Sequence, residues 1–223
     1  MSTMGVLLAF TAAAGPARAA GPAAGAPDPA ATPTDKPVGI GMRLAGFDAA
    51  VARANGYAVV TLPDGSQASV PADKAAAARK GEYVPTTGVL TAEQIAGKDA
   101  DGGMSTNNYA ELPGDCGKSY VALWAQGGAR ATLHTGFHLI PSAGQPWDVE
   151  WRINIEDNGG RSTQPYNEQD GAISGNSWIA HLRLLNLSYG WAQSTVIWYS
   201  SYTITTRGWV CWSAGPSTGA YIN

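Results

Sequence analysis

Two histidines and two carboxylates in the C-terminal half of the chain have the side-chain types that acid–base and metal chemistry require. His134 and His138 have the HxxxH spacing, which on a helix lets two imidazoles share one zinc ion. The residues around them alternate between polar and apolar, as in a strand, where four positions span about 13 Å. Two rings so far apart cannot share an ion, and the central Glu of a zinc protease is absent. We therefore predict no metal site and no cofactor.

Asp148 and Glu150 are the carboxylates that could work with a histidine. They lie on the polar face of an alternating segment, 147–156, which the sequence PSAGQP joins to another alternating segment, 130–140. Because a short connection favours an antiparallel hairpin, the plausible registers place His138 opposite Asp148 or Glu150. These three residues are therefore the candidate catalytic residues of a hydrolase. A solvated strand face would carry the same carboxylates, and we favour that interpretation, so no catalytic residue is assigned.

The elements that would position these side chains are predicted to be antiparallel strands. All eight tryptophans lie between Trp124 and Trp212, and apolar runs of strand length recur between turn signals. We place strands at 119–126, 130–140, 147–156, 178–187, 194–205 and 207–212. This spacing predicts a mostly β domain over residues 116–223, either an antiparallel β-sandwich or a small barrel. Trp147, Trp151 and Trp198 lie on predicted apolar faces and are expected in the core.

The chain contains two cysteines, Cys116 and Cys211, which lie 95 positions apart. Neither has a CxxC partner, which argues against a zinc site. An even number of cysteines in an exported chain argues for a disulfide. Since Cys116 precedes the first predicted strand and Cys211 lies in the last, the bond would join the two ends of the β domain.

The residues ahead of the β domain divide into three parts. Residues 20–37 are rich in Ala, Gly and Pro and are predicted to be a flexible leader. Residues 38–96 predict a small α/β segment, with helices at 47–54 and 71–80 and a hairpin whose strands are 57–62 and 67–70. Its few large apolar residues suggest a pro-segment, a surface spacer or an N-terminal subdomain. Residues 97–115 are polar and Gly-rich and are predicted to be a linker.

The first 19 residues predict export. The apolar run from Gly5 to Ala14 is too short to span a bilayer, and Ala17-Arg18-Ala19 matches the small-x-small site of a signal peptidase. No Lys or Arg precedes the apolar run, so we expect the true translation start to lie upstream. We predict that residues 1–19 are a signal peptide, that the protein is secreted and extracellular, and that no later segment spans a membrane.

Charge and aromatic residues limit the classes of partner. Charged residues make up 14% of the chain and the net charge is −3, which argues against nucleic acid. Four aromatic residues, Tyr166, Tyr189, Trp191 and Trp212, lie in predicted loops or turns or near the C-terminus, where they could stack on sugars or anchor a protein. We therefore predict a non-enzymatic extracellular module that binds glycan, cell wall or protein through these residues. The alternative is an extracellular hydrolase with residues 38–96 as its pro-segment. The sequence does not predict the oligomeric state.

Several short stretches resemble a group of small secreted proteins from high-GC Gram-positive bacteria. These stretches are Gly114-Asp-Cys116, Ser119-Tyr-Val121, Thr135-Gly-Phe137, Trp151-Arg-Ile-Asn154 and Cys211-Trp-Ser-Ala-Gly-Pro216. The resemblance covers about the last half of the chain. Since that group has no assigned activity, the resemblance implies export and a disulfide-closed domain, and implies nothing about mechanism.

Overall fold

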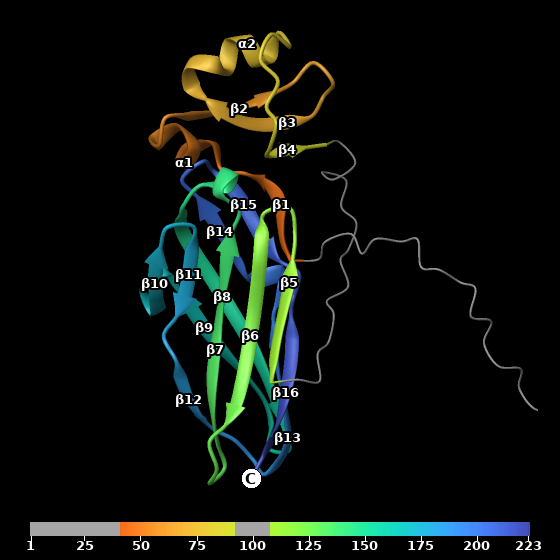
Figure 1. Ribbon diagram of the computed structural model, residues 1–223, viewed down its shortest axis with the longest axis vertical. Coiled ribbons are helices and arrows are strands. Elements are labelled where there is room, and N and C mark those ends of the chain that lie inside the picture. Colours follow the sequence, from red (N-terminus) through yellow and green to blue (C-terminus); the bar gives the residue numbers. More distant parts are fainter. Residues whose placement is uncertain (1–40, 92–107) are drawn as a thin grey trace, which may run out of the picture. The chain divides into compact units, whose positions relative to one another are not determined.

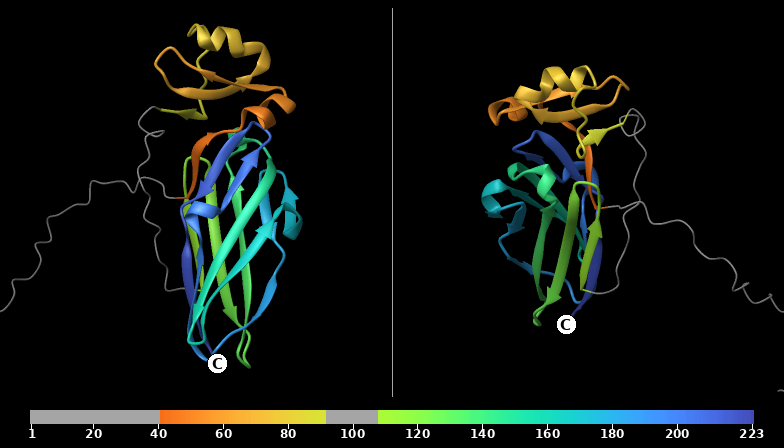
Figure 2. Two further views of the ribbon diagram at one scale, coloured as in Figure 1. Left: turned by 180° about the vertical axis from the view of Figure 1, so that it is seen from behind. Right: turned by 45° about the horizontal axis from the view of Figure 1, so that its top comes forward.

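The structure is a computed structural model that describes residues 41–91 and 108–223 (Figure 1). The predicted signal peptide, the predicted leader and most of the predicted linker lie outside the described residues. The described part is mostly antiparallel β structure arranged as a sandwich of two layers (Figures 1 and 2). Within these residues the strands form no closed barrel, so of the two predicted architectures the sandwich is confirmed.

Each layer is built around one long pair of strands. In the first, layer A, β6 pairs with β7, β5 adds to β6, and β11 and β12 add to β7. In the second, layer B, β8 lies between β9 and the two successive strands β13 and β14, which pair onward with β16 and β15. Layer A contains β5 (Tyr109–Pro113), β6 (Gly117–Ala125), β7 (Arg130–Leu139), β10 (Gly171–Ser174), β11 (Ser177–Ala180) and β12 (Arg183–Asn186). Layer B contains β1 (Met42–Phe47), β8 (Pro146–Asp157), β9 (Gly160–Asn167), β13 (Gly190–Val196), β14 (Tyr202–Thr205), β15 (Trp209–Ser213) and β16 (Ser217–Ile222).

The core lies between the layers and follows the strand alternation. In β8 the odd-numbered residues from Val149 to Ile155 are buried, as their apolar pattern predicts. The rings of Phe137, Trp151 and Trp178 contact one another, with centroid distances of 5.4, 5.8 and 6.1 Å. The buried indole Nε1 of Trp151 donates a hydrogen bond of 2.9 Å to Thr135 Oγ1. That hydroxyl in turn donates to the backbone carbonyl of Tyr120, so the polar side-chain atoms of Trp151 and Thr135 are both satisfied.

The predicted hairpin between 130–140 and 147–156 is wrong. The first segment is β7 in layer A and the second is β8 in layer B, and their connection contains a short 3-10 turn, Pro141–Ala143. The two strands meet face to face through the core, where the rings of Phe137 and Trp151 are in contact. An alternating strand can bury its apolar face by pairing beside its neighbour or by packing across from it, and here the second arrangement occurs.

Other predicted strands differ in their limits. The segment 178–187 divides into β11 and β12, and the segment 194–205 is interrupted between β13 and β14 by the 3-10 turn η4 (Trp198–Ser200). β5 lies within residues predicted as linker, and the sequence reasoning missed β1, β9, β10 and β16 as well. Trp151 is in the core as expected, but Trp147 and Trp198 are exposed by 53% and 46%. Trp147 lies at the start of β8, beside a register shift in its pairing with β14, and Trp198 lies in the turn, so the strand alternation directs neither side chain inward.

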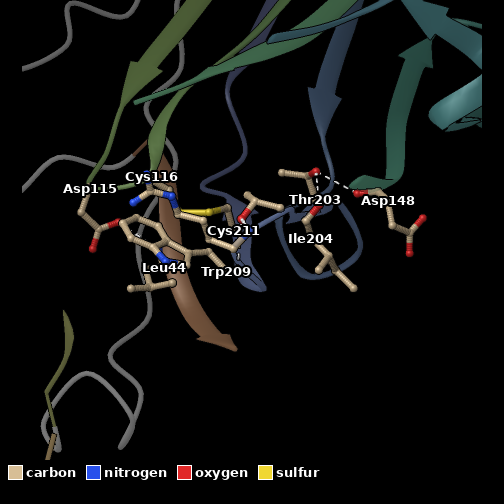
Figure 3. Close-up of a disulfide and its surroundings, with 10 residues drawn as sticks. Leu44, Asp115, Cys116, Asp148, Thr203, Ile204, Trp209 and Cys211 are labelled. Carbon is tan, nitrogen blue, oxygen red and sulfur yellow. Dashed lines mark hydrogen bonds between the residues drawn. A yellow bond between two sulfur atoms is a disulfide. The ribbon is translucent and has the colours of Figure 1, made fainter. Parts of the chain in front are cut away.

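The Cys116–Cys211 disulfide is present, with a Cα–Cα distance of 6.0 Å. Figure 3 shows the bond with Leu44, Asp115 and Trp209 around it. It connects the start of β6 with β15, beside β1, whose Leu44 pairs with Cys211. The sequence predicted that Cys211 lies in the last strand of the domain. This is wrong, because β16 follows β15. The bond ties together the corner where the two layers join, since β1 also pairs with β6 at Met42.

The segment 38–96 contains the helices and the hairpin that its sequence predicts. These elements are α1 (Ala49–Ala54), β2 (Tyr57–Thr61), β3 (Gln67–Pro71), the turn η1 (Ala72–Lys74), α2 (Ala75–Arg79) and the short β4 (Val89–Leu90). Val60, Val70 and three alanines form a small core of their own. The segment is joined to the β domain, because β1 is a strand of layer B and Ser69 Oγ donates a 2.6 Å hydrogen bond to the carbonyl of Arg207.

Candidate ligand-binding face

The three candidate catalytic residues do not form one site. His138 lies on the outer face of layer A, where its Nδ1 is 2.7 Å from Ser177 Oγ and its cross-strand neighbour is Lys118. Asp148 and Glu150 lie on the outer face of layer B, on β8. The prediction that His138 faces one of these carboxylates is therefore wrong, because the hairpin that would bring them together does not form.

Asp148 and Glu150 line a hollow of about 370 Å³ with Glu168, Asp170 and Arg152. Partial burial raises the pKa of Asp148 above its ordinary value, and the nearby charges of Glu168 and Glu150 raise it further. Hydrogen bonds from Arg152 and Tyr202 hold the pKa of Glu150 below its ordinary value. The pKa values of two neighbouring carboxylates are thus shifted in opposite directions, an arrangement that can support acid–base chemistry.

Aromatic residues cover part of the outer face of layer A. The ring of Tyr120 stacks on Tyr109 and on His138, at 5.9 and 5.7 Å, and meets the edge of His134 at 5.3 Å. The ring of Trp124 also contacts His134, at a centroid distance of 5.6 Å. Tyr120 is buried by these neighbours, and this burial, with a smaller effect of the Glu111 charge, raises its pKa to about 12. Since its neighbours cover it, Tyr120 itself offers no flat surface to a ligand, whereas Tyr109 and Trp124 are exposed by 44% and 37%.

Tyr166, one of the predicted ligand-binding aromatics, is buried. It belongs to β9, is only 3% exposed, and packs edge-on against Trp178. The guanidinium of Arg183 lies 3.7 Å from the centre of its ring. Tyr166 is therefore not exposed as expected, because it lies at an inward position of its strand, although it also lines the hollow beside Asp148 and Glu150.

Tyr189 and Trp191 are exposed, as predicted, by 65% and 50%. Trp191 projects outward from β13 and is paired with Tyr221 of β16, which is 68% exposed. The Trp191 ring lies directly over Gly219, where a Cβ atom would approach the ring to 2.4 Å. We call Trp191 and Tyr221 the aromatic platform. Tyr221 was not predicted, because its strand, Ser217–Ile222, lacks the alternation of polar and apolar residues that indicates a strand.

A fixed set of polar side chains lies beside the platform. Gln193 Nε2 donates to Ser217 Oγ at 2.8 Å, and the hydroxyls of Thr195 and Ser217 are 2.7 Å apart. Across the next pair of strands, Asn154 donates to Glu156, which also forms an ion pair with Arg161. Since these groups point outward and are held by one another, they offer hydrogen-bond donors and acceptors in fixed positions.

Trp212, the last predicted binding residue, is half-buried and outward-facing on β15. It pairs with Tyr202 of β14, and their rings stack at 6.2 Å. The Tyr202 hydroxyl donates a 3.0 Å hydrogen bond to Glu150, which fixes the ring beside the acidic hollow. The structure therefore brings three of the four predicted aromatics to the outside of layer B or its edge.

Within residues 41–91 and 108–223, no three His, Cys, Asp or Glu side chains gather as a metal ion would require. In the same part of the chain, no helix has the length and apolarity needed to cross a bilayer. Comparison with known proteins finds no family model, no curated protein and no solved structure that matches this chain. The outer face of layer B therefore has to be interpreted from its own chemistry.

Proposed function

We propose that this protein is an extracellular, non-enzymatic module that binds glycan, such as a cell-wall polysaccharide, through the outer face of layer B. The observation that carries the proposal is the aromatic platform, in which Trp191 and Tyr221 are paired and exposed, with the Trp191 ring over Gly219. An aromatic ring held flat on a rigid sheet stacks well on the apolar face of a sugar ring.

The surroundings of the platform favour a sugar over a protein partner. Protein interfaces have a largely apolar centre in which charged residues are depleted. Here the positions next to Trp191 are Gln193, Glu156 and Arg161, which suit the many hydroxyl groups of a glycan. The net charge of −3 and the acidic hollow argue against nucleic acid, whose phosphates would be repelled.

A binding assay with insoluble polysaccharides tests the proposal. The purified protein is mixed with cellulose, chitin or isolated cell walls and the bound fraction is measured after sedimentation. Trp191→Ala and Tyr221→Ala should each reduce binding about tenfold, because an aromatic contact contributes roughly 1 kcal/mol beyond the area it buries. Trp124→Ala, which removes a partly exposed tryptophan from the outer face of layer A, is the matched control. Full binding by both platform variants would refute the assignment of glycan binding to Trp191 and Tyr221.

Export is part of the same proposal and is supported by the disulfide, which persists in oxidising compartments. Mass spectrometry of the culture medium should find the chain beginning at Ala20. A chain retained inside the cell with Cys116 and Cys211 reduced would contradict the extracellular location.

A polysaccharide hydrolase is the second candidate, and the opposite pKa shifts of Asp148 and Glu150 in one hollow favour it. Asp148 would act as the general acid and Glu150 as the base or nucleophile. The pairing of β1 with β15 and β6 argues against removal of residues 38–96 as a pro-segment in this candidate. Release of reducing ends from a polysaccharide that Asp148→Asn abolishes, and that the remote Glu82→Gln retains, would establish hydrolysis.

A further inference from the structure

We propose that the outer face of layer B binds one extended stretch of a linear, uncharged polysaccharide, with Tyr202 and Trp212 as a second aromatic contact far from the platform. This inference rests on the proposed glycan-binding function and specifies the shape and charge of the ligand. It assigns to Tyr202 and Trp212 a role that the platform alone does not require.

The strand pairing places both aromatic groups on one face and separates them along β8. Gln193 lies opposite Glu156, and Tyr202 lies opposite Glu150. These two levels are six residues apart on β8, which is about 20 Å at the usual rise of a strand. Trp191 lies two residues beyond Gln193, or about 7 Å further. The two aromatic groups are therefore too far apart for a single sugar to touch both, and an extended chain can reach both.

The positions between the two aromatic groups are polar and outward-facing. At successive levels of β8 they are Glu156 beside Gln193 and Asn154 beside Thr195, followed by Arg152. Asn154 is paired on its other side with Thr163 of β9. The order along the strand is thus one aromatic group, three polar levels and a second aromatic group. Such an order fits a chain of sugar rings whose hydroxyls meet the middle of the face and whose apolar faces meet its two ends.

Charge near the second aromatic group limits the class of polysaccharide. The hollow beside Tyr202 is lined by four carboxylates, two of which, Glu150 and Asp170, are paired with arginines. The net local charge is negative, and a uronic acid or phosphate group placed there would be repelled. A neutral chain of hexoses or N-acetylated hexosamines meets no such cost, because its hydroxyls can hydrogen-bond to carboxylates.

Titration calorimetry with a length series of soluble oligosaccharides tests the extended site. The probes are cellohexaose and chitohexaose, each with its disaccharide, and the proteins are the native chain, Trp191→Ala, Trp212→Leu and the Trp124→Ala control. Leucine at position 212 keeps apolar packing against Tyr202 but removes the flat ring. We expect a hexaose to bind at least tenfold more tightly than its disaccharide. Trp212→Leu should lose about tenfold for the hexaose and little for the disaccharide, and Trp191→Ala should weaken both.

The outcomes separate the extended site from the proposed function. Equal affinity of the native chain for hexaose and disaccharide, with Trp212→Leu unchanged, would overturn the extended site and leave the platform standing. Tighter binding of a hexagalacturonate, titrated in parallel as the charged probe, than of either neutral hexaose would overturn the inference about charge. No binding of any probe by the native chain, together with no sedimentation on insoluble polysaccharides, would refute the glycan-binding function itself. Thermal unfolding of each variant confirms that Trp212→Leu is folded.

Discussion

Breaking the Cys116–Cys211 disulfide should lower the free energy of unfolding by up to about 4.7 kcal/mol. The bond joins residues 95 positions apart. In the chain-entropy model, a closed loop of about 100 residues contributes about 4.7 kcal/mol by restricting the unfolded chain. For a domain of this size each kcal/mol corresponds to roughly 2–4 °C in Tm, so the expected decrease is roughly 10–20 °C.

The measurement compares urea unfolding of three proteins followed by circular dichroism. These are the native oxidised chain, the same chain reduced, and the double variant Cys116→Ala/Cys211→Ala. Both cysteines are fully buried, so the alanine variant loses packing in addition to the cross-link. The reduced native chain keeps every side-chain atom and isolates the effect of the bond. A loss of less than about 1 kcal/mol on reduction would refute the entropic argument, since the loop would then be restricted without the bond.

Three further substitutions and one control test other parts of the fold, each by urea unfolding. Gly88→Ala should lower the free energy of unfolding by about 2–4 kcal/mol, because the new Cβ would lie 1.8 Å from the Trp209 ring at a φ of +67°. The control Gly65→Ala, at a position with positive φ and open space, should lower it by only about 1 kcal/mol. Trp151→Phe should cost about 1–3 kcal/mol through the lost hydrogen bond to Thr135 and the smaller ring, and an unchanged midpoint would contradict the core geometry. Asp148→Asn should stabilise the protein at neutral pH. Since burial and nearby carboxylates raise the pKa of Asp148 in the folded state, the folded chain binds this proton more tightly than the unfolded chain does, and its ionised carboxylate costs stability above that pKa. The gain should disappear as the pH falls toward the ordinary value of 3.8, and a destabilised neutral-pH variant would contradict the assigned shift.

Local patterns predicted the features that depend on few residues. The alternation of 147–156 identified the inward face of β8, because a strand with one buried face carries apolar residues at every second position. Asp64-Gly65 identified the turn between β2 and β3, since glycine adopts the positive φ that this turn requires. The cysteine pair was correct because the chain offers no other disulfide partner.

The pairing of β7 could not be predicted from the same patterns. A strand with one apolar face satisfies its alternation equally well beside β8 or across the core from it. The choice depends on the strands that pair with the two edges of β7. β6, which precedes β7 in the sequence, pairs with one edge, and β11 and β12, which follow it, pair with the other. These contacts are non-local, and no residue in the connection between β7 and β8 specifies them. The error about β7 then removed His138 from the carboxylates with which it had been grouped.

The aromatic face of layer B depends on an interruption that the sequence hides. Residues 194–205 were predicted as one strand with Trp198 in the core, and an uninterrupted strand would place Tyr202 on the same inner face. In the structure the paired residue numbers of β8 and β13 sum to 349, whereas those of β8 and β14 sum to 352, a shift of three.

Because three is odd, the shift exchanges the faces of the strand. Odd-numbered residues point outward in β13, and even-numbered residues point outward in β14. Trp191 and Tyr202 therefore face the same side although an uninterrupted strand would place them on opposite sides. The extra residues include the turn η4 and are accommodated at the level of Arg152, whose carbonyl accepts a hydrogen bond from Ile197. The odd length of the insertion is thus what allows layer B to present aromatic rings at both ends of one face.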